Sequence, residues 1–289
     1  MRSILKRIAR RVLRRQPAGQ PAVPPLTQTD PTFPARKARK LARLAELLRT
    51  DLPHRLSERG YDFLTDELRQ QFNITDTDNV SSNQYDPTAL AMIETYRDGW
   101  ILDCGAGSRR VYYDNVVNFE ICDYDSTDVR GVGERLPFRD GVFDAAFSFA
   151  VLEHVKDPFA CAREIARTLK PGGVLYCVVP FLQPLHGYPN HYFNMSHQGL
   201  RTLFEPSLII EKQEVIPSGH PIWTLAWIIA RWGQALPPRV RRRFLSMRLG
   251  ELLADPVEQL QRDYAAALPV AAQFELASTT ALFARKAAA

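Results

Sequence analysis

The stretch that decides the fold of this chain is Ile101-Leu102-Asp103-Cys104-Gly105-Ala106-Gly107-Ser108. An apolar run ends in an acidic residue, and two glycines separated by one residue follow it. Such a run is typical of a strand buried on both faces, and glycines in the turn after it let a ligand approach the backbone closely. The stretch therefore predicts a ligand-binding turn at the carboxyl end of a central parallel strand.

Short apolar runs alternate with helical patterns around this stretch. The runs that fit strands are 100–104, 115–121, 128–132, 143–150 and 173–181, with two later ones at 207–216 and 276–285. Helices fit at 157–169, at 196–204 after Ser196, and from Asp86-Pro87 to Gly99, because an acidic N-cap followed by proline is a helix start. The alternation predicts an α/β, Rossmann-like doubly wound sheet that is mostly parallel with an antiparallel edge strand.

The remaining segments suggest a division into three parts. Residues 1–34 form a basic amphipathic segment and a proline-rich linker, and 35–84 form a helical extension with helices at 35–50 and 61–72. Residues 85–289 form the sheet domain, with a helical insert at about 217–276 before the last strand. The insert is rich in tryptophan and arginine and suits a helical cap, with a substrate lid, a dimer face and a membrane-surface patch as alternatives.

Composition and charge exclude several classes of protein. The chain of 289 residues is 45% hydrophobic and 24% charged, and no run of 18 uncharged apolar residues fits a membrane span. Its four cysteines are far apart, which suits neither a disulfide scaffold nor a zinc site and favours a reducing, cytoplasmic location. The formal net charge of +5 comes from the first fifteen residues, which carry seven of the 37 basic side chains and no acid, so 30 basic residues face 32 acidic ones elsewhere. We therefore expect no nucleic-acid partner.

The first fifteen residues combine this charge with an apolar stripe. Met1, Leu5, Ile8 and Val12 share one face of a helical pattern, with arginines over the rest. The combination suits peripheral contact with an anionic membrane, and the alternative is a basic tail with no such role.

Four further segments follow the glycine turn in a characteristic order: Glu134-Arg135-Leu136-Pro137-Phe138, Asp140-Gly141-Val142-Phe143-Asp144, Val151-Leu152-Glu153-His154-Val155 and Leu169-Lys170-Pro171-Gly172-Gly173. In this order and spacing, residues 85–286 resemble class I S-adenosylmethionine-dependent methyltransferases, in particular the small-molecule type 11 group. The resemblance implies methyl transfer from S-adenosyl-L-methionine to a small-molecule or glycan acceptor.

The resemblance also implies a set of cofactor-binding residues. Asp103, Gly105, Ala106 and Gly107 match the motif that cradles the methionine part of the cofactor, and Glu120 matches the acid that holds the ribose hydroxyls. The adenine position falls on Val132 and Gly133, and the stretch that lines the cofactor after the fourth strand falls on Phe149 and Ala150.

Three departures from the family pattern keep a second interpretation open. Arg109 replaces the third glycine, Val132 replaces the acid that meets adenine, and the segment 107–120 is too short for the usual helix plus strand. The alternative is a catalytically silent methyltransferase-like domain that acts as a binding or membrane-associated module.

Histidines supply the candidate catalytic groups. His186 and His191 follow the fifth strand directly, at the edge where open α/β sheets bind ligands, and a histidine there could serve an oxygen acceptor as a general base. Plain loop packing is the alternative for both. No matching cysteine or carboxylate pattern accompanies them, so we predict no metal site. For His154 we favour a role in orienting the strand-to-helix turn.

Overall fold

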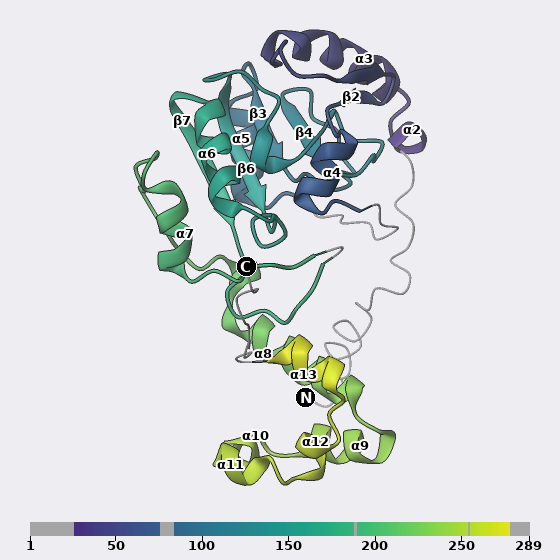
Figure 1. Ribbon diagram of the computed structural model, residues 1–289, viewed down its shortest axis with the longest axis vertical. Coiled ribbons are helices and arrows are strands. Elements are labelled where there is room, and N and C mark those ends of the chain that lie inside the picture. Colours follow the sequence, from purple (N-terminus) through teal and green to yellow (C-terminus); the bar gives the residue numbers. More distant parts are fainter. Residues whose placement is uncertain (1–25, 76–83, 188–189, 254, 278–289) are drawn as a thin grey trace, which may run out of the picture. The chain divides into compact units, whose positions relative to one another are not determined.

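A computed structural model describes residues 26–75, 84–187, 190–253 and 255–277 (Figure 1). The chain forms two compact units. Among the described residues, the sheet unit comprises 26–75, 84–181, 187 and 190–213, and the helical unit comprises 182–186, 214–253 and 255–277. The basic amphipathic segment predicted at 1–15 and most of the strand predicted at 276–285 lie outside the described residues.

The sheet unit contains a seven-stranded sheet in the order β1-β2-β5-β4-β3-β6-β7. Its parallel part comprises β3 (Ile101–Cys104), β4 (Val116–Glu120), β5 (Val129–Arg130), β6 (Phe143–Phe149) and β7 (Leu169–Val178). These strands confirm the first five predicted ones, and their order is that of a doubly wound sheet read outward from β3. The α/β, Rossmann-like fold is therefore confirmed.

The antiparallel edge of the sheet is built by the N-terminal extension. Strand β1 (Arg55–Ser57) pairs antiparallel with β2 (Gly60–Asp62), and β2 joins β5 in parallel. The predicted helix at 61–72 is therefore only partly right, because β2 and a capped turn precede α4 (Asp66–Phe72). Thr65 ends the extended segment by accepting the backbone N–H of Leu68 with its side chain.

Helices cover both faces of the sheet. On one face α5 (Pro87–Thr95) buries Ala89 and Ile93 against β3, β4 and β6. On the other face the core includes residues of α3 (Phe33–Leu44), α6 (Pro158–Thr168) and α7 (His197–Phe204). The predicted helices after Asp86-Pro87, at 157–169 and at 196–204 are confirmed. The first and the last start at the predicted N-caps, Asp86 and Ser196.

The predicted strand at 207–216 is wrong. These residues form no strand, and Ile209 is 92% exposed. An apolar run forms a stable strand only beside a partner strand. The other late strand is predicted at 276–285, but Leu276 ends helix α13 (Val270–Leu276), and 278–285 lie outside the described residues. The antiparallel strand lies instead at the opposite edge, in β1.

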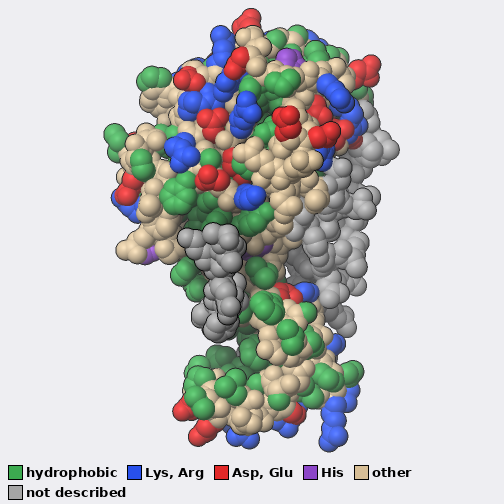
Figure 2. Space-filling model, viewed as in Figure 1, with side chains coloured by type: hydrophobic (Ala, Val, Ile, Leu, Met, Phe, Trp, Pro, Cys, Tyr) green, Lys and Arg blue, Asp and Glu red, His purple; other side chains and the backbone are tan. Residues whose placement is uncertain are grey.

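The helical unit is small and has an apolar surface. It includes α8 (Pro221–Ala235), α9 (Pro238–Ser246), α10 (Leu249–Leu252), α11 (Pro256–Gln259), α12 (Asp263–Ala266) and α13, so the predicted helical insert is confirmed as helical. Its core is formed by Leu236, Phe244, Tyr264, Leu268 and Ala272. Large apolar side chains nevertheless remain exposed on this unit, among them Trp223 and Leu253. Hydrophobic side chains appear as green areas on the lower part of Figure 2. No helix among the described residues is long and apolar enough to cross a membrane.

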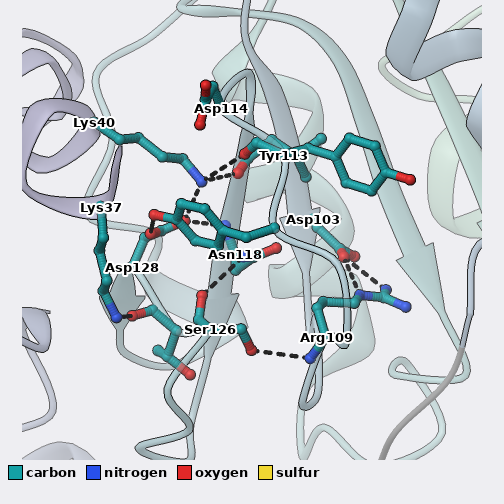
Figure 3. Close-up of polar contacts among 12 residues, drawn as sticks. Lys37, Lys40, Asp103, Arg109, Tyr113, Asp114, Asn118, Ser126 and Asp128 are labelled. Atoms are coloured by element: carbon teal, nitrogen blue, oxygen red, sulfur yellow. Dashed lines mark hydrogen bonds and ion pairs between the residues drawn. The ribbon is translucent and has the colours of Figure 1, made fainter. Parts of the chain in front are cut away.

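A buried ion pair anchors α3 to the sheet unit. Lys40 Nζ lies 2.6 Å from Asp128 Oδ2, and both side chains are almost fully buried (Figure 3). The same ammonium donates to the carbonyls of Tyr113 and Val116, which frame the start of β4. The carboxylate also accepts the hydroxyl of Tyr112 and the backbone N–H of Asn118. Burial lowers the pKa of Lys40, and the charge of Asp128 opposes this shift.

This ion pair predicts a large asymmetry between two substitutions on α3. Lys40→Met should lower the free energy of unfolding by about 3–5 kcal/mol, because it leaves the Asp128 carboxylate buried without a countercharge. Arg36→Ala, the control, removes partly exposed ion pairs and should cost only about 0–1 kcal/mol. Urea unfolding followed by circular dichroism measures both, and equal small losses would contradict the structural importance of the buried pair.

Candidate functional site

Three neighbouring parallel strands end at one edge of the sheet. β4, β3 and β6 lie side by side, so Glu120, the turn after Cys104 and the residues after Phe149 are brought to the same edge. The turn is held on β4 because the backbone N–H groups of Gly105 and Ala106 both donate to the carbonyl of Phe119, at 2.9 and 3.0 Å. The structure thus brings together the predicted residues at the carboxyl ends of β3 and β4.

Glu120 binds the glycine turn directly. Its Oε2 accepts the backbone N–H of Gly107 at 2.7 Å, and its Oε1 accepts the N–H groups of Ile121 and Cys122 at 2.8 and 3.3 Å. Burial raises the pKa of Glu120, while these three N–H donors oppose the shift. The carboxylate therefore has a structural task besides any contact with a ribose.

The glycines are required partly by the protein itself. Gly105 has a φ of +83°, and a Cβ there would lie 2.3 Å from Cγ2 of Val151. Gly107 also has positive φ, at 64°. Opposite the turn, Ala150 holds a φ of +55°, which is uncommon for a residue other than glycine and occurs at functional sites. The turn after β3 and the loop after β6 are thus in contact at Gly105 and Val151.

Arg109 fills the space beside the turn. Residues 108–115 form no helix, as the short segment before Glu120 suggested, and the Arg109 guanidinium folds back onto Asp103. Its Nε and Nη2 lie 2.9 and 2.6 Å from Asp103 Oδ2, and the ring of Tyr85 lies over the guanidinium at 4.0 Å. The Tyr85 hydroxyl donates to the same oxygen at 2.5 Å.

Tyr85 is a site residue that the sequence analysis missed. It precedes Asp86, the N-cap of α5, and belongs to none of the recognised motifs. The only signal for it in the sequence is that an aromatic residue stands next to a helix start. Its ring also lies 5.6 Å from that of Phe147 and 6.5 Å from that of Phe149, so the predicted lining residue Phe149 belongs to the same aromatic group.

The predicted adenine position is enclosed by protein. Val132 is 1% exposed. It packs with Leu64, which precedes α4, and with Leu68, which lies within α4. Gly133 opens a short 3-10 helix (Gly133–Arg135), and a Cβ there would lie 2.7 Å from Sγ of Cys161. Both residues are therefore needed for packing at this position, whatever they contact in a ligand.

The two predicted catalytic histidines belong to different units. His191 lies in the sheet unit, where its ring is 5.3 Å from that of His154 and its Nε2 is 2.9 Å from Asn194 Oδ1. His186 lies in the helical unit, where its ring is 5.3 Å from that of Trp227. His154 Nδ1 lies 2.7 Å from the carbonyl of Asn190, so it orients the loop after β7.

The hydrogen-bond acceptors at the strand ends suit a ligand with hydroxyl groups and an amino-acid end. Oδ1 of Asp103 is buried and accepts no hydrogen bond from the residues that the structure describes. A buried carboxylate oxygen without a partner is costly, so a ligand that donates to it would gain affinity. Glu120, the two positive-φ glycines and this oxygen are compatible with the ribose and methionine parts of S-adenosylmethionine.

Comparison with known proteins supports the same interpretation. Residues 103–177 match the family model described as a methyltransferase domain. An uncharacterized methyltransferase from Mycobacterium sp. (strain JLS) is 36% identical over 69 residues, which is 24% of this chain and 27% of that protein. Another from Schizosaccharomyces pombe is 40% identical over 58 residues, 20% of this chain and 21% of that protein.

The chain spans about a quarter of the length of the curated relatives it matches. Among solved structures, a possible histamine N-methyltransferase from Thermotoga maritima is 23% identical, with a TM-score of 0.32 and coverage of 42% of this chain and 70% of that one. The family match at residues 103–177 coincides with β3 to β7 and with the turn, Glu120 and Arg109. Residues 103–177 thus match the methyltransferase-domain family, and they lie on a Rossmann-like sheet, as expected for a class I, S-adenosylmethionine-dependent methyltransferase.

Proposed function

We propose that the sheet unit binds S-adenosylmethionine at the ends of β3, β4 and β6 and transfers its methyl group to a small-molecule or glycan acceptor. The observation that carries this proposal is the joint placement of Glu120 on the glycine turn and of the unpartnered Asp103 oxygen beside it. We place this activity in the cytoplasm, in keeping with four free cysteines.

When bound, S-adenosylmethionine supplies an activated methyl group on its sulfonium. Glu120 and Asp103 would hold the cofactor, and its methyl group would pass to the lone pair of the acceptor while the electron pair of the carbon–sulfur bond stays on sulfur. The protein has mainly to hold the two molecules in line, which contributes on the order of 7–11 kcal/mol. A hydroxyl acceptor also loses a proton, which a neighbouring base would accept.

A specific feature favours the alternative of a catalytically silent binding domain. The helix that normally follows a glycine turn is absent from 108–115, and with it the partial positive charge of a helix N-terminus. Calorimetric titration with S-adenosylhomocysteine separates the two proposals, because the silent domain predicts no binding.

Glu120→Ala should weaken binding of S-adenosylhomocysteine by about 1.5–3 kcal/mol, or about 10–150-fold, through loss of hydrogen bonds to the ribose and to the turn. Because the pKa of Glu120 is raised, affinity should also fall on acidification at a higher pH than for an exposed glutamate. Isothermal titration calorimetry across pH measures both effects.

Glu164→Ala is the matched control for this experiment. Glu164 also accepts a backbone N–H, that of Leu136, and pairs with Arg167, but it lies on α6. Its removal should leave the affinity within about twofold. Unchanged affinity in Glu120→Ala would mean that the cofactor does not lie at the end of β4.

We further propose His191 and His186 as residues on the acceptor side. His191 is the stronger candidate, because it follows β7 within the sheet unit and contacts His154 rather than the glycine turn. His186 is the second candidate, and it belongs to the helical unit.

Replacing either His191 or His186 with Gln should therefore leave the affinity for S-adenosylhomocysteine within about twofold. The same variants should lower transfer of a radiolabelled methyl group into the small-molecule or glycan fraction of a cell extract, as expected for groups that act on the acceptor. A tenfold loss of cofactor affinity with normal transfer would reassign the altered histidine to cofactor binding.

We also propose that residues 1–15 attach the protein peripherally to an anionic membrane. Their seven basic side chains would each contribute about 1 kcal/mol near such a surface. The exposed apolar side chains of the helical unit offer a second contact of the same kind, since Trp223 and Leu249 are both more than half exposed.

Sedimentation with vesicles tests this attachment. The full chain should bind vesicles containing phosphatidylserine, and added salt should release it. A full-length variant with the seven basic residues of 1–15 replaced by glutamine should bind much less, and neither protein should bind neutral vesicles. Equal sedimentation of the two proteins would remove residues 1–15 from the account. We substitute rather than truncate because Leu26 and Phe33 pack on Tyr112 of the sheet unit.

A further inference from the structure

Arg109 is held in one position from several sides. Its side chain is 4% exposed, and its Nε and Nη2 both donate to Oδ2 of Asp103, whose side chain is fully buried (Figure 3). Its backbone N–H donates to Oγ of Ser126 at 2.9 Å. The carbonyl of Ser126 in turn accepts Nδ2 of Asn118 on β4 at 2.8 Å. The backbone of Arg109 is therefore tied to the β4–β5 connection, and its guanidinium is tied to Asp103 on β3.

Tyr85 completes this arrangement from the side of α5. Its ring covers the guanidinium, and its hydroxyl donates to the same Oδ2. Burial raises the pKa of Tyr85 well above its usual value, so the hydroxyl keeps its proton and remains a donor. Three donor groups, two on Arg109 and one on Tyr85, thus converge on a single carboxylate oxygen.

The convergence leaves the second carboxylate oxygen of Asp103, Oδ1, without a donor among the described residues. An arginine often binds both oxygens of a carboxylate in parallel, but here both nitrogens bind Oδ2. Oδ1 remains buried without a hydrogen bond from the described residues. It lies two residues before Gly105, where the chain turns away from the sheet.

The charges of this group restrict what it would bind. Arg109 already compensates the charge of Asp103, so a ligand carrying only a cation gains little Coulomb energy from the pair. A zwitterion gains from both, because its ammonium meets the carboxylate oxygen while its carboxylate is attracted by the guanidinium. The α-amino-acid end of S-adenosylmethionine is such a zwitterion.

We propose that Arg109 and Tyr85 are positioning residues that hold Asp103 by Oδ2, so that Oδ1 receives the ammonium of the cofactor's amino-acid end. This inference rests on the proposed function and assigns a binding role to the arginine that replaces the family's third glycine. It concerns recognition of the amino-acid end only, and the nucleoside end is held independently.

The test compares two ligands that differ in that end. S-Adenosylhomocysteine carries the amino acid, and 5′-methylthioadenosine keeps the nucleoside and the thioether but lacks it. In calorimetric titrations, Arg109→Met should weaken binding of S-adenosylhomocysteine about tenfold or more, the loss typical of a hydrogen bond to a charged group. Its affinity for 5′-methylthioadenosine should stay within about twofold. Tyr85→Phe should show the same selectivity with a smaller loss.

Two further variants make the result decisive. Arg110→Met, which removes the neighbouring exposed arginine, should change neither affinity. If Arg109→Met unfolds because Asp103 is left buried and charged, the double variant Asp103→Asn with Arg109→Met removes both charges and should show the same selective loss. Circular dichroism checks that each variant is folded.

Three outcomes would overturn the inference. An equal loss of affinity for both ligands would mean that Arg109 only supports the turn. Unchanged affinity for S-adenosylhomocysteine would mean that the arginine has no part in binding. If the unaltered protein binds 5′-methylthioadenosine as tightly as S-adenosylhomocysteine, the amino-acid end is not recognised, although the proposed cofactor site stands. Separately, if the unaltered protein binds neither ligand, the proposed function fails together with this inference.

Discussion

The buried carboxylate of Asp128 is the interaction on which the sheet unit depends. The β3–β4 connection contains no helix, and α3 from the N-terminal extension contributes Leu41 and Leu44 to the core on the face that α6 also covers. Lys40 on α3, the hydroxyl of Tyr112 and the backbone of Asn118 all donate to Asp128. A charge so deeply buried persists only when it is paired and hydrogen-bonded, which makes α3 an integral part of the fold rather than an appendage.

The same polar network reaches the cofactor edge. From Asp128 it passes through Asn118 and Ser126 to Arg109, and from there to Asp103 in the glycine turn. The missing helix therefore has two consequences. It removes a partial positive charge from the ligand site, and it leaves room for an arginine whose full charge is fixed by neighbours from β3, the β4–β5 connection and the segment before α5.

The division of the chain into two units separates the elements of the site. Every predicted cofactor residue lies in the sheet unit, together with His191, whereas His186 lies in the helical unit. The helical unit has a small core of its own and a surface with many exposed apolar side chains, which is typical of a module that interacts with something else. Acceptor choice would then depend on the loops around the sheet, because one fold hosts many functions.

The sequence by itself determined the central strands, the helices at 157–169 and 196–204, and the glycine turn with Glu120, because apolar periodicity, N-caps and glycine spacing act locally. Only the tertiary structure decided that the antiparallel edge is β1, that 207–216 is not a strand, and that Tyr85 and Arg109 converge on Asp103. These features depend on partners distant in sequence: a strand needs a neighbour to complete its hydrogen bonds, and a buried arginine needs a carboxylate that the fold places against it.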